Sequence, residues 1–161
     1  MYSYNKIFLT ALASTIEMFK NSKLNILLVE DDEVDVMTVQ RAFKQSKITS
    51  PLFVAGNGSE ALSMLRGKTG EPAVIPAARR IVLLDLDMPA MNGLEFLRQL
   101  RADANIGSIP VVIITTSDEE QYLADAYELN VSGYLKKPST YDKFVELLVI
   151  LNDYWTACEM N

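Results

Sequence analysis

The sequence contains no histidine and a single cysteine, Cys158. Without histidine, the chain cannot supply a Ser-His-Asp triad, a histidine-ligated zinc site or a phosphohistidine of its own. One cysteine cannot form an intrachain disulfide or a cysteine metal cluster. A reducing cytoplasm is therefore the expected location.

The sequence also lacks an excess of basic residues and a long apolar run. Its 21 acidic and 15 basic residues give a formal net charge of -6. This balance argues against a nucleic-acid or anionic-membrane binder, because phosphate groups attract a basic surface. No stretch reaches the roughly 20 apolar residues that a membrane helix needs, so no membrane span is predicted.

The first 22 residues are expected to be an N-terminal extension. Four large apolar residues at helical spacing, Phe8, Leu12, Ile16 and Phe19, favour an amphipathic helix. A secretory signal is a weaker alternative. A true start at Met18 is another, and the sequence alone does not decide. One compact domain is predicted at 23–156, followed by a short tail at 157–161.

Apolar, strand-like segments alternate with helix-like segments along this domain. Strands are predicted at 24–29, 51–55, 81–84, 109–114 and 131–135. Helices are predicted at 34–46 and 59–66, from about 93 onward, from 118 onward, and at 139–155. Five strands alternating with five helices predict an α/β fold whose parallel sheet is covered on both faces.

Several local features are predicted with these elements. Asn92 and Asp32 are expected to cap the helices that follow them, and Ser59 is expected to cap the helix that ends at residue 66. The segment 67–80, with two glycines and two prolines, is expected to be a surface loop. The inward face of the helix that begins at 118 is predicted to use Leu123, Ala126 and Tyr127.

Polar residues follow the predicted strands at their carboxyl ends. In a doubly covered parallel sheet, ligands bind outside these ends. The residues that gather there are Glu30, Asp31, Asp85, Thr115 and Lys137. Converging carboxylates need a cation, and an all-oxygen set suits Mg²⁺. Mg²⁺ and the lysine together form a receptor for a phosphoryl group. Asp85 is the natural nucleophile, which predicts an aspartyl phosphate.

This set, with the turns Met88-Pro89 and Asn92-Gly93, resembles the receiver domain of two-component response regulators. The resemblance covers about 24–155. It implies a flavodoxin-like fold with strand order 2-1-3-4-5, and transfer of a phosphoryl group from a histidine kinase to Asp85.

The resemblance also implies a metal site. Asp31 and Asp85 would bind Mg²⁺ directly, Glu30 through water, and Asp87 through its backbone carbonyl. The domain would catalyse only its own Mg²⁺-dependent phosphorylation and dephosphorylation.

A switch is implied by the same resemblance. Thr115 and Tyr134 match the switch pair, whose hydroxyl moves toward the phosphoryl oxygens while the aromatic ring turns inward. Lys137 would pair with the phosphoryl group, and its bond to Pro138 is expected to be cis.

The chain ends soon after the last predicted helix, so it is expected to resemble stand-alone regulators that act by docking or relaying. The loop at 67–80, the segment 127–129 and the Tyr154-Trp155 ending look similar to regulators that serve phytochrome-type kinases. The expected partners are such a kinase, a downstream protein of unknown identity and a second copy of the chain. The homodimer would use the helix from 118, the strand 131–135 and the helix 139–155.

Two alternatives remain. The Asp85-Leu86-Asp87 sequence after an apolar strand resembles haloacid-dehalogenase-type phosphohydrolases, in which the first acid is the nucleophile and the second the acid/base. Chain order argues against this, because the DxD strand usually comes first there, whereas Glu30 and Asp31 precede Asp85 here. A receiver-like domain that binds partners without phosphorylation is disfavoured by the intact set of acids, threonine and lysine.

Overall fold

The computed structural model describes residues 23–67, 70–89, 91–117 and 120–160. The strands are β1 (Asn25–Val29), β2 (Leu52–Ala55), β3 (Arg80–Leu84), β4 (Val111–Thr115) and β5 (Gly133–Lys136). The helices are α2 (Glu33–Gln45), α3 (Gly58–Arg66), α4 (Gly93–Ala102), α5 (Glu120–Glu128) and α6 (Tyr141–Ala157). The predicted N-terminal helix in 1–22 and the predicted helix start at Asp118 and Glu119 lie outside the described residues. Every helix in the described ranges is too short or too polar to cross a bilayer.

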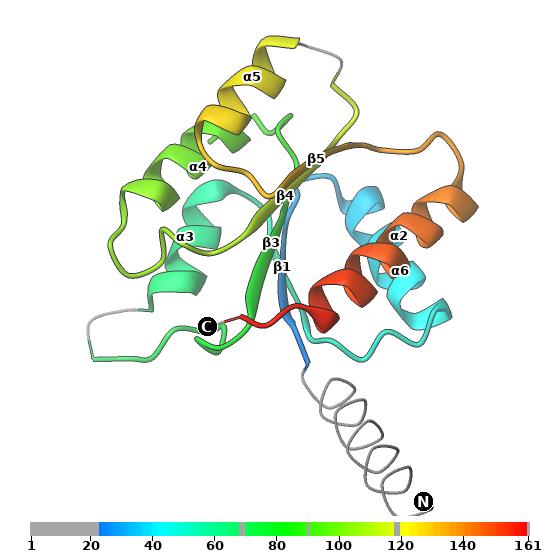
Figure 1. The fold of residues 1–161 in the computed structure, drawn as a ribbon, viewed down its shortest axis with the longest axis horizontal. Helices are drawn as coiled ribbons and strands as arrows, with labels where there is room; N and C mark the ends of the chain where they lie inside the picture. Colours follow the sequence, from blue (N-terminus) through cyan, green and yellow to red (C-terminus); the bar gives the residue numbers. More distant parts are fainter. Residues whose placement is uncertain (1–22, 68–69, 90, 118–119, 161) are drawn as a thin grey trace, which may run out of the picture.

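The five strands form one parallel sheet in the order β2-β1-β3-β4-β5. Helices α2 and α6 cover one face of the sheet, and α3, α4 and α5 cover the other (Figure 1). The predicted flavodoxin-like architecture and strand order are therefore confirmed. The strand order reverses between β1 and β3, so the carboxyl ends of these two strands flank the topological switch point.

Each face of the sheet carries its own apolar core. Successive side chains of a strand point to opposite faces. In β1, Leu27 and Val29 pack toward α3, α4 and α5, whereas Ile26 and Leu28 pack toward α2 and α6. Strands β3 and β4 are buried along their whole length. This double burial gives the carboxyl ends of the central strands a well-packed base.

The first turns of the helices follow the predicted caps with one exception. The Asp32 carboxylate accepts hydrogen bonds from two backbone N–H groups in the first turn of α2, and the Asn92 side chain accepts one in α4. The predicted cap at Ser59 is wrong, because Asn57 caps α3 and the helix begins at Gly58. An asparagine side chain in extended backbone can reach the N–H three residues on, as Asn57 does.

The predicted inward face of α5 is largely wrong. Ala126 is fully buried, but Leu123 is 40% exposed and Tyr127 is 53% exposed. The partly buried Tyr122 and Leu129 pack against the core instead. Positions 122, 126 and 129 follow one another at the helical spacings of four and three, so the buried side of this segment is turned away from Leu123 and Tyr127.

The segment 67–80 is not entirely a surface loop. Ile75 is fully buried, and Arg80, which is 8% exposed, belongs to β3. The Arg80 guanidinium donates hydrogen bonds to the backbone carbonyls of Leu65, Ile75 and Pro76. The end of this segment is thus tied to the last turn of α3, which fixes where β3 begins.

Candidate functional site

Backbone hydrogen bonds hold three site residues just beyond the strand ends. The N–H of Glu30 donates to the carbonyl of Ala55 at 3.0 Å, and that of Asp85 donates to Val29 at 3.0 Å. The N–H of Lys137 donates to the Thr115 carbonyl at 2.8 Å. These bonds continue the parallel ladders by one step, so the side chains of Glu30, Asp85 and Lys137 start from fixed positions at one edge of the sheet.

Three carboxylates converge at this edge. One oxygen from each of Glu30, Asp31 and Asp85 lies within 4.8 Å of the other two. Glu30 and Asp85 are buried, whereas Asp31 is exposed. The structure therefore brings together the three acids that the sequence predicted. Oxygen donors with one side open to solvent are the ligand set of a hard divalent cation such as Mg²⁺.

The Asp85 carboxylate has one engaged oxygen and one available oxygen. Its Oδ2 accepts a hydrogen bond from the backbone N–H of Asp87 at 3.2 Å. Its buried Oδ1 has no hydrogen-bond partner within the described residues, and it lies 3.6 Å from Lys137 Nζ. A buried carboxylate oxygen is costly without a partner, so Oδ1 fits a role toward a cation or an incoming group.

Burial sets the protonation behaviour of both buried acids. The pKa of Asp85 is raised by burial and by the nearby Asp87 carboxylate, while the charge of Lys137 opposes the shift. The pKa of Glu30 is also raised by burial, which outweighs its hydrogen bond from Lys137. Burial is the largest cause of both shifts, so each expresses the cost of keeping a buried carboxylate ionised, a cost that a bound cation would relieve.

Lys137 faces the acids, but its shortest contacts are not with Asp85. Its Nζ donates to Glu30 Oε2 at 2.8 Å and to Asp35 Oδ2 at 2.6 Å. Burial lowers the pKa of Lys137, but the bonds to Asp35 and Glu30 and the charge of Asp85 outweigh this effect, so the pKa lies above its ordinary value. Lys137 is therefore charged at neutral pH.

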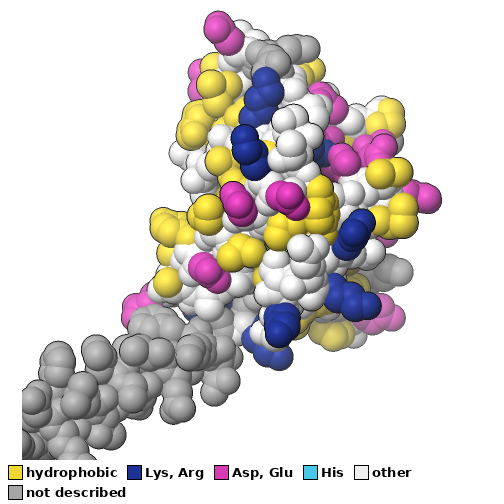
Figure 2. All heavy atoms as spheres, turned by 90° about the vertical axis from the view of Figure 1, so that its right-hand side faces the viewer, with side chains coloured by type: hydrophobic (Ala, Val, Ile, Leu, Met, Phe, Trp, Pro, Cys, Tyr) yellow, Lys and Arg dark blue, Asp and Glu magenta, His cyan; other side chains and the backbone are white. Residues whose placement is uncertain are grey.

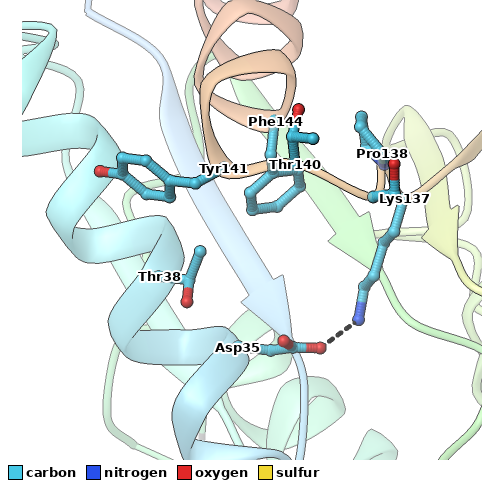
Figure 3. Close-up of a pocket in the computed structure, with 8 residues that line it drawn as sticks. Asp35, Thr38, Lys137, Pro138, Thr140, Tyr141 and Phe144 are labelled. Carbon is cyan, nitrogen blue, oxygen red and sulfur yellow. Dashed lines mark hydrogen bonds and ion pairs between the residues drawn. The ribbon is translucent and has the colours of Figure 1, made fainter.

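Asp35 is a site residue that the sequence reasoning missed. It lies in the first turn of α2, four positions after Asp31. The available signal was the run of acids that continues past Glu30-Asp31 into the first turn of the predicted helix. Only the packing of α2 beside the end of β5 shows that this acid meets Lys137 (Figure 3).

Thr115, the last residue of β4, is fully buried. Its hydroxyl accepts a hydrogen bond from the backbone N–H of Ser117 at 3.2 Å and donates one to Asp87 Oδ2 at 3.3 Å. The Asp87 carboxylate thus contacts the predicted switch hydroxyl directly, a contact that the sequence did not predict.

Tyr134 lies on β5 beside the same region. In the β4–β5 register it pairs with Ile113, and Thr115 pairs with Lys136. Side chains two residues apart on a strand share a face, so Tyr134 and Thr115 start from the same face of the sheet. The Tyr134 ring is partly buried against the core beneath α3, α4 and α5.

The turns beside Asp85 pack closely. An ideal Cβ placed on Gly93 would lie 2.6 Å from the carbonyl oxygen of Asp85, so only glycine lets α4 begin this close to the site. The predicted cis bond between Lys137 and Pro138 is not found, because the described residues contain no cis peptide bond. The trans form is the intrinsically preferred state of an X-Pro bond.

Comparisons with known proteins give one consistent result. A family model described as the response regulator receiver domain matches residues 26–149. The regulatory protein FilR2 of Methanothrix harundinacea is 35% identical over 130 residues, covering 81% of this chain and 82% of FilR2. The response regulator Rcp1 of Synechocystis sp. is 33% identical over 130 residues, covering 81% of this chain and 87% of Rcp1.

Solved structures agree with the sequence matches. The phosphorylated cyanobacterial phytochrome response regulator RcpA superposes with a TM-score of 0.75 at 27% identity, covering 86% of this chain and 99% of RcpA. The Mn²⁺-bound form of Rcp1 superposes with a TM-score of 0.73 at 30% identity, covering 87% of this chain and 99% of Rcp1. These matches give no support to the phosphohydrolase alternative.

Proposed function

Because the chain belongs to the response regulator receiver domain family of two-component systems, we propose that it accepts a phosphoryl group from a histidine kinase on Asp85. The observation that carries this proposal is the buried Asp85 Oδ1, which has no hydrogen-bond partner within the described residues and lies 3.6 Å from Lys137 Nζ. No other acid of the cluster combines a strand-end position, burial and an available oxygen facing a cation.

In the proposed reaction, an Asp85 oxygen attacks the phosphorus atom of a phosphohistidine. A P–O bond forms as the P–N bond breaks, and the electron pair of the broken bond stays on the imidazole nitrogen. Lys137, charged at neutral pH, lies where it can bind the oxygens of the transferred group. The product is an aspartyl phosphate, which the domain itself can later hydrolyse.

We propose Mg²⁺ as the cofactor, held directly by Asp31 and Asp85, through water by Glu30, and by the backbone carbonyl of Asp87. The indirect role of Glu30 fits its contacts, because Oε1 accepts a bond from the Asp32 N–H and Oε2 accepts one from Lys137. Mg²⁺ supplies charge stabilisation for the phosphoryl oxygens. The Mn²⁺-bound form of Rcp1 supports a divalent cation in this family.

Thr115 and Tyr134 are proposed as the switch that carries phosphorylation to the surface. The Thr115 hydroxyl would leave Asp87 for a phosphoryl oxygen, and Tyr134 would move into the space behind it. The face formed by α5, β5 and α6 is proposed as the output surface, for a downstream protein or a second copy of the chain. Its helices expose large apolar side chains, which support a docking role: Leu123, Tyr127, Ile150 and Tyr154.

A phytochrome-type kinase is proposed as the partner, because RcpA is a phytochrome response regulator and aligns with 86% of this chain. The cytoplasmic location stays a prediction from the cysteine content.

The proposed function is tested by incubating the protein with acetyl phosphate and Mg²⁺ and measuring its intact mass. Wild type should gain one phosphoryl group, and the gain should disappear with EDTA. Asp85→Asn should gain none, whereas Asp87→Asn, the matched control at the neighbouring acid, should still gain one. Equal labelling of Asp85→Asn and wild type would refute the proposal.

A further inference from the structure

The Asp35–Lys137 ion pair joins two elements that are far apart in the sequence. Asp35 lies in the first turn of α2, and Lys137 lies directly after β5, at the start of the connection to α6. Their 2.6 Å contact is the shortest that Lys137 makes with the three acids around it, compared with 2.8 Å to Glu30 and 3.6 Å to Asp85. The pair, drawn in Figure 3, therefore helps to fix the position of the Lys137 ammonium, which lies 3.6 Å from Asp85 Oδ1.

The two acids that hold Lys137 differ in their exposure to water. The Glu30 side chain is 4% exposed, and its second oxygen is already bonded to the Asp32 N–H. The Asp35 side chain is 43% exposed. A buried carboxylate that loses its cation cannot recover its solvation, whereas an exposed carboxylate is rehydrated at once. Asp35 is thus the partner that Lys137 can leave at low cost.

Resting on the proposed phosphorylation of Asp85, we infer that Asp35 is a positioning residue that holds Lys137 in the unphosphorylated protein and releases it when a phosphoryl group arrives. An ammonium has three N–H donors, and two of them point to Glu30 and Asp35. At 3.6 Å, Asp85 lies beyond hydrogen-bond distance. Binding a phosphoryl group on Asp85 therefore draws Nζ toward Asp85 and away from Asp35, while Glu30 keeps its bond.

This release reaches the surface through a pocket of about 220 Å³ between α2 and the start of α6. Asp35 and Thr38 line it from α2, and Lys137, Tyr141 and Phe144 line it from the opposite side (Figure 3). The pocket opens on the α2–α6 side of the molecule, where hydrophobic side chains lie among charges of both signs (Figure 2). Breaking the ion pair separates Asp35 from Lys137, which line this pocket on the side nearest to Asp85.

A second link between α2 and α6 does not involve Lys137. The Tyr141 hydroxyl donates a hydrogen bond to Gln45 Oε1 at 3.0 Å, and the Arg41 guanidinium lies 5.0 Å from the centre of the Tyr141 ring. This link keeps the far part of the pocket together when Asp35 is released. The change is therefore confined to the end of α2 that borders the phosphorylation site.

The test is a titration with beryllofluoride, a phosphoryl mimic, at saturating Mg²⁺. Asp35→Asn removes the competing acid, so beryllofluoride should bind about two- to fivefold more tightly than to wild type, the range expected for a partly exposed ion pair. Asp35→Glu keeps the charge and should return the affinity toward the wild-type value. Glu33→Gln is the matched control, because it removes an exposed acid from the same helical turn.

A spectroscopic readout separates positioning from general stability. In wild type, the ¹⁵Nζ NMR signal of Lys137 should shift when beryllofluoride binds, and the amide signals of Asp35 and Thr38 should shift with it. In Asp35→Asn, the free protein should already show much of the Lys137 shift.

The outcomes distinguish the inference from the function on which it rests. Absence of beryllofluoride binding to wild type would refute the phosphorylation site itself. Normal binding to wild type with unchanged affinity in Asp35→Asn would overturn the role of Asp35. An equal gain in Glu33→Gln would show a general charge effect and would also overturn it.

Discussion

Replacing Asp85 with asparagine should stabilise the metal-free protein. The carboxylate is buried beside Glu30 and Asp31, and its Oδ1 has no hydrogen-bond partner within the described residues. Asparagine is nearly the same size and keeps an oxygen that can accept the Asp87 N–H bond. The substitution therefore removes a charge without opening a cavity.

The magnitude follows from the distances. Oxygens of Glu30 and Asp85 lie within 4.8 Å of each other, so these carboxylates repel by at least about 3.5 kcal/mol for an effective dielectric constant of about 20. Lys137 at 3.6 Å attracts it by about 4.6 kcal/mol under the same assumption. Asp31 is exposed, and water screens its repulsion to about 1–2 kcal/mol. These terms nearly cancel. Burial and the nearby Asp87 carboxylate both disfavour the charge on Asp85 and decide the sign, so we expect Asp85→Asn to gain about 1–2 kcal/mol.

The stabilisation that Asp85→Asn gives over wild type should depend on pH. Burial raises the pKa of Asp85 in the folded protein, so the folded state holds this proton more tightly than the unfolded chain does. As the pH falls through the folded pKa toward the unfolded value of about 3.9, wild type becomes more stable relative to the variant. The advantage of Asp85→Asn should therefore be largest near pH 7 and smallest near pH 4.

Urea denaturation with EDTA, followed by far-UV circular dichroism, measures both effects. Adding Mg²⁺ at pH 7 should stabilise wild type, so the difference in free energy of unfolding between wild type and Asp85→Asn should become smaller. Asp142→Asn, which changes an exposed acid in α6, controls for the loss of a charge and should shift the free energy of unfolding by less than about 0.5 kcal/mol. If the free energy of unfolding of metal-free Asp85→Asn at pH 7 were lower than that of wild type by 1 kcal/mol or more, the attraction of Lys137 would outweigh burial, and the expected stabilisation would be wrong.

Three further predictions follow from the same contacts. Gly93→Ala places a methyl group 2.6 Å from the Asp85 carbonyl oxygen, so it should lower the free energy of unfolding by about 1–3 kcal/mol and slow phosphorylation by acetyl phosphate. Gly56→Ala is the control, because the nearest atom to its methyl group would lie at 3.6 Å, and it should have neither effect. Arg101→Ala removes four hydrogen bonds to backbone carbonyls and should lower the free energy of unfolding, measured in urea, by about 2–4 kcal/mol. Lysine cannot reproduce the geometry of the guanidinium, so a wild-type free energy of unfolding in Arg101→Lys would contradict this prediction. Mg²⁺ should raise the melting temperature of wild type but not of Asp31→Asn, and an equal rise in both would exclude Asp31 as a ligand.

The fold was predictable because the strands carry strong local signals. The apolar runs that become β1, β3 and β4 are buried on both faces, and a polar residue ends each of them. The positions of Glu30, Asp31 and Asp85 follow from this pattern, because parallel strands end at the same edge. The cluster within 4.8 Å is the result.

The remaining features depend on packing that one sequence does not encode locally. The stripes at 122, 126, 129 and at 123, 126, 127 are both compatible with a helix, and only the placement of α5 on the sheet selects the first. The contact between Asp35 and Lys137 depends on how α2 lies beside the end of β5, 102 positions away. The hydrogen bond from Thr115, the last residue of β4, to Asp87, which follows β3, likewise depends on the register of β3 and β4.

The most direct test of the central claim is to locate the phosphoryl group in the chain. Borohydride reduces an aspartyl phosphate to homoserine, and fragmentation of the tryptic peptide 81–98 distinguishes position 85 from position 87. After treatment with acetyl phosphate and Mg²⁺, we expect homoserine at position 85 and unchanged aspartate at position 87. Homoserine at position 87, or an unmodified peptide from protein that carries the added mass, would contradict it.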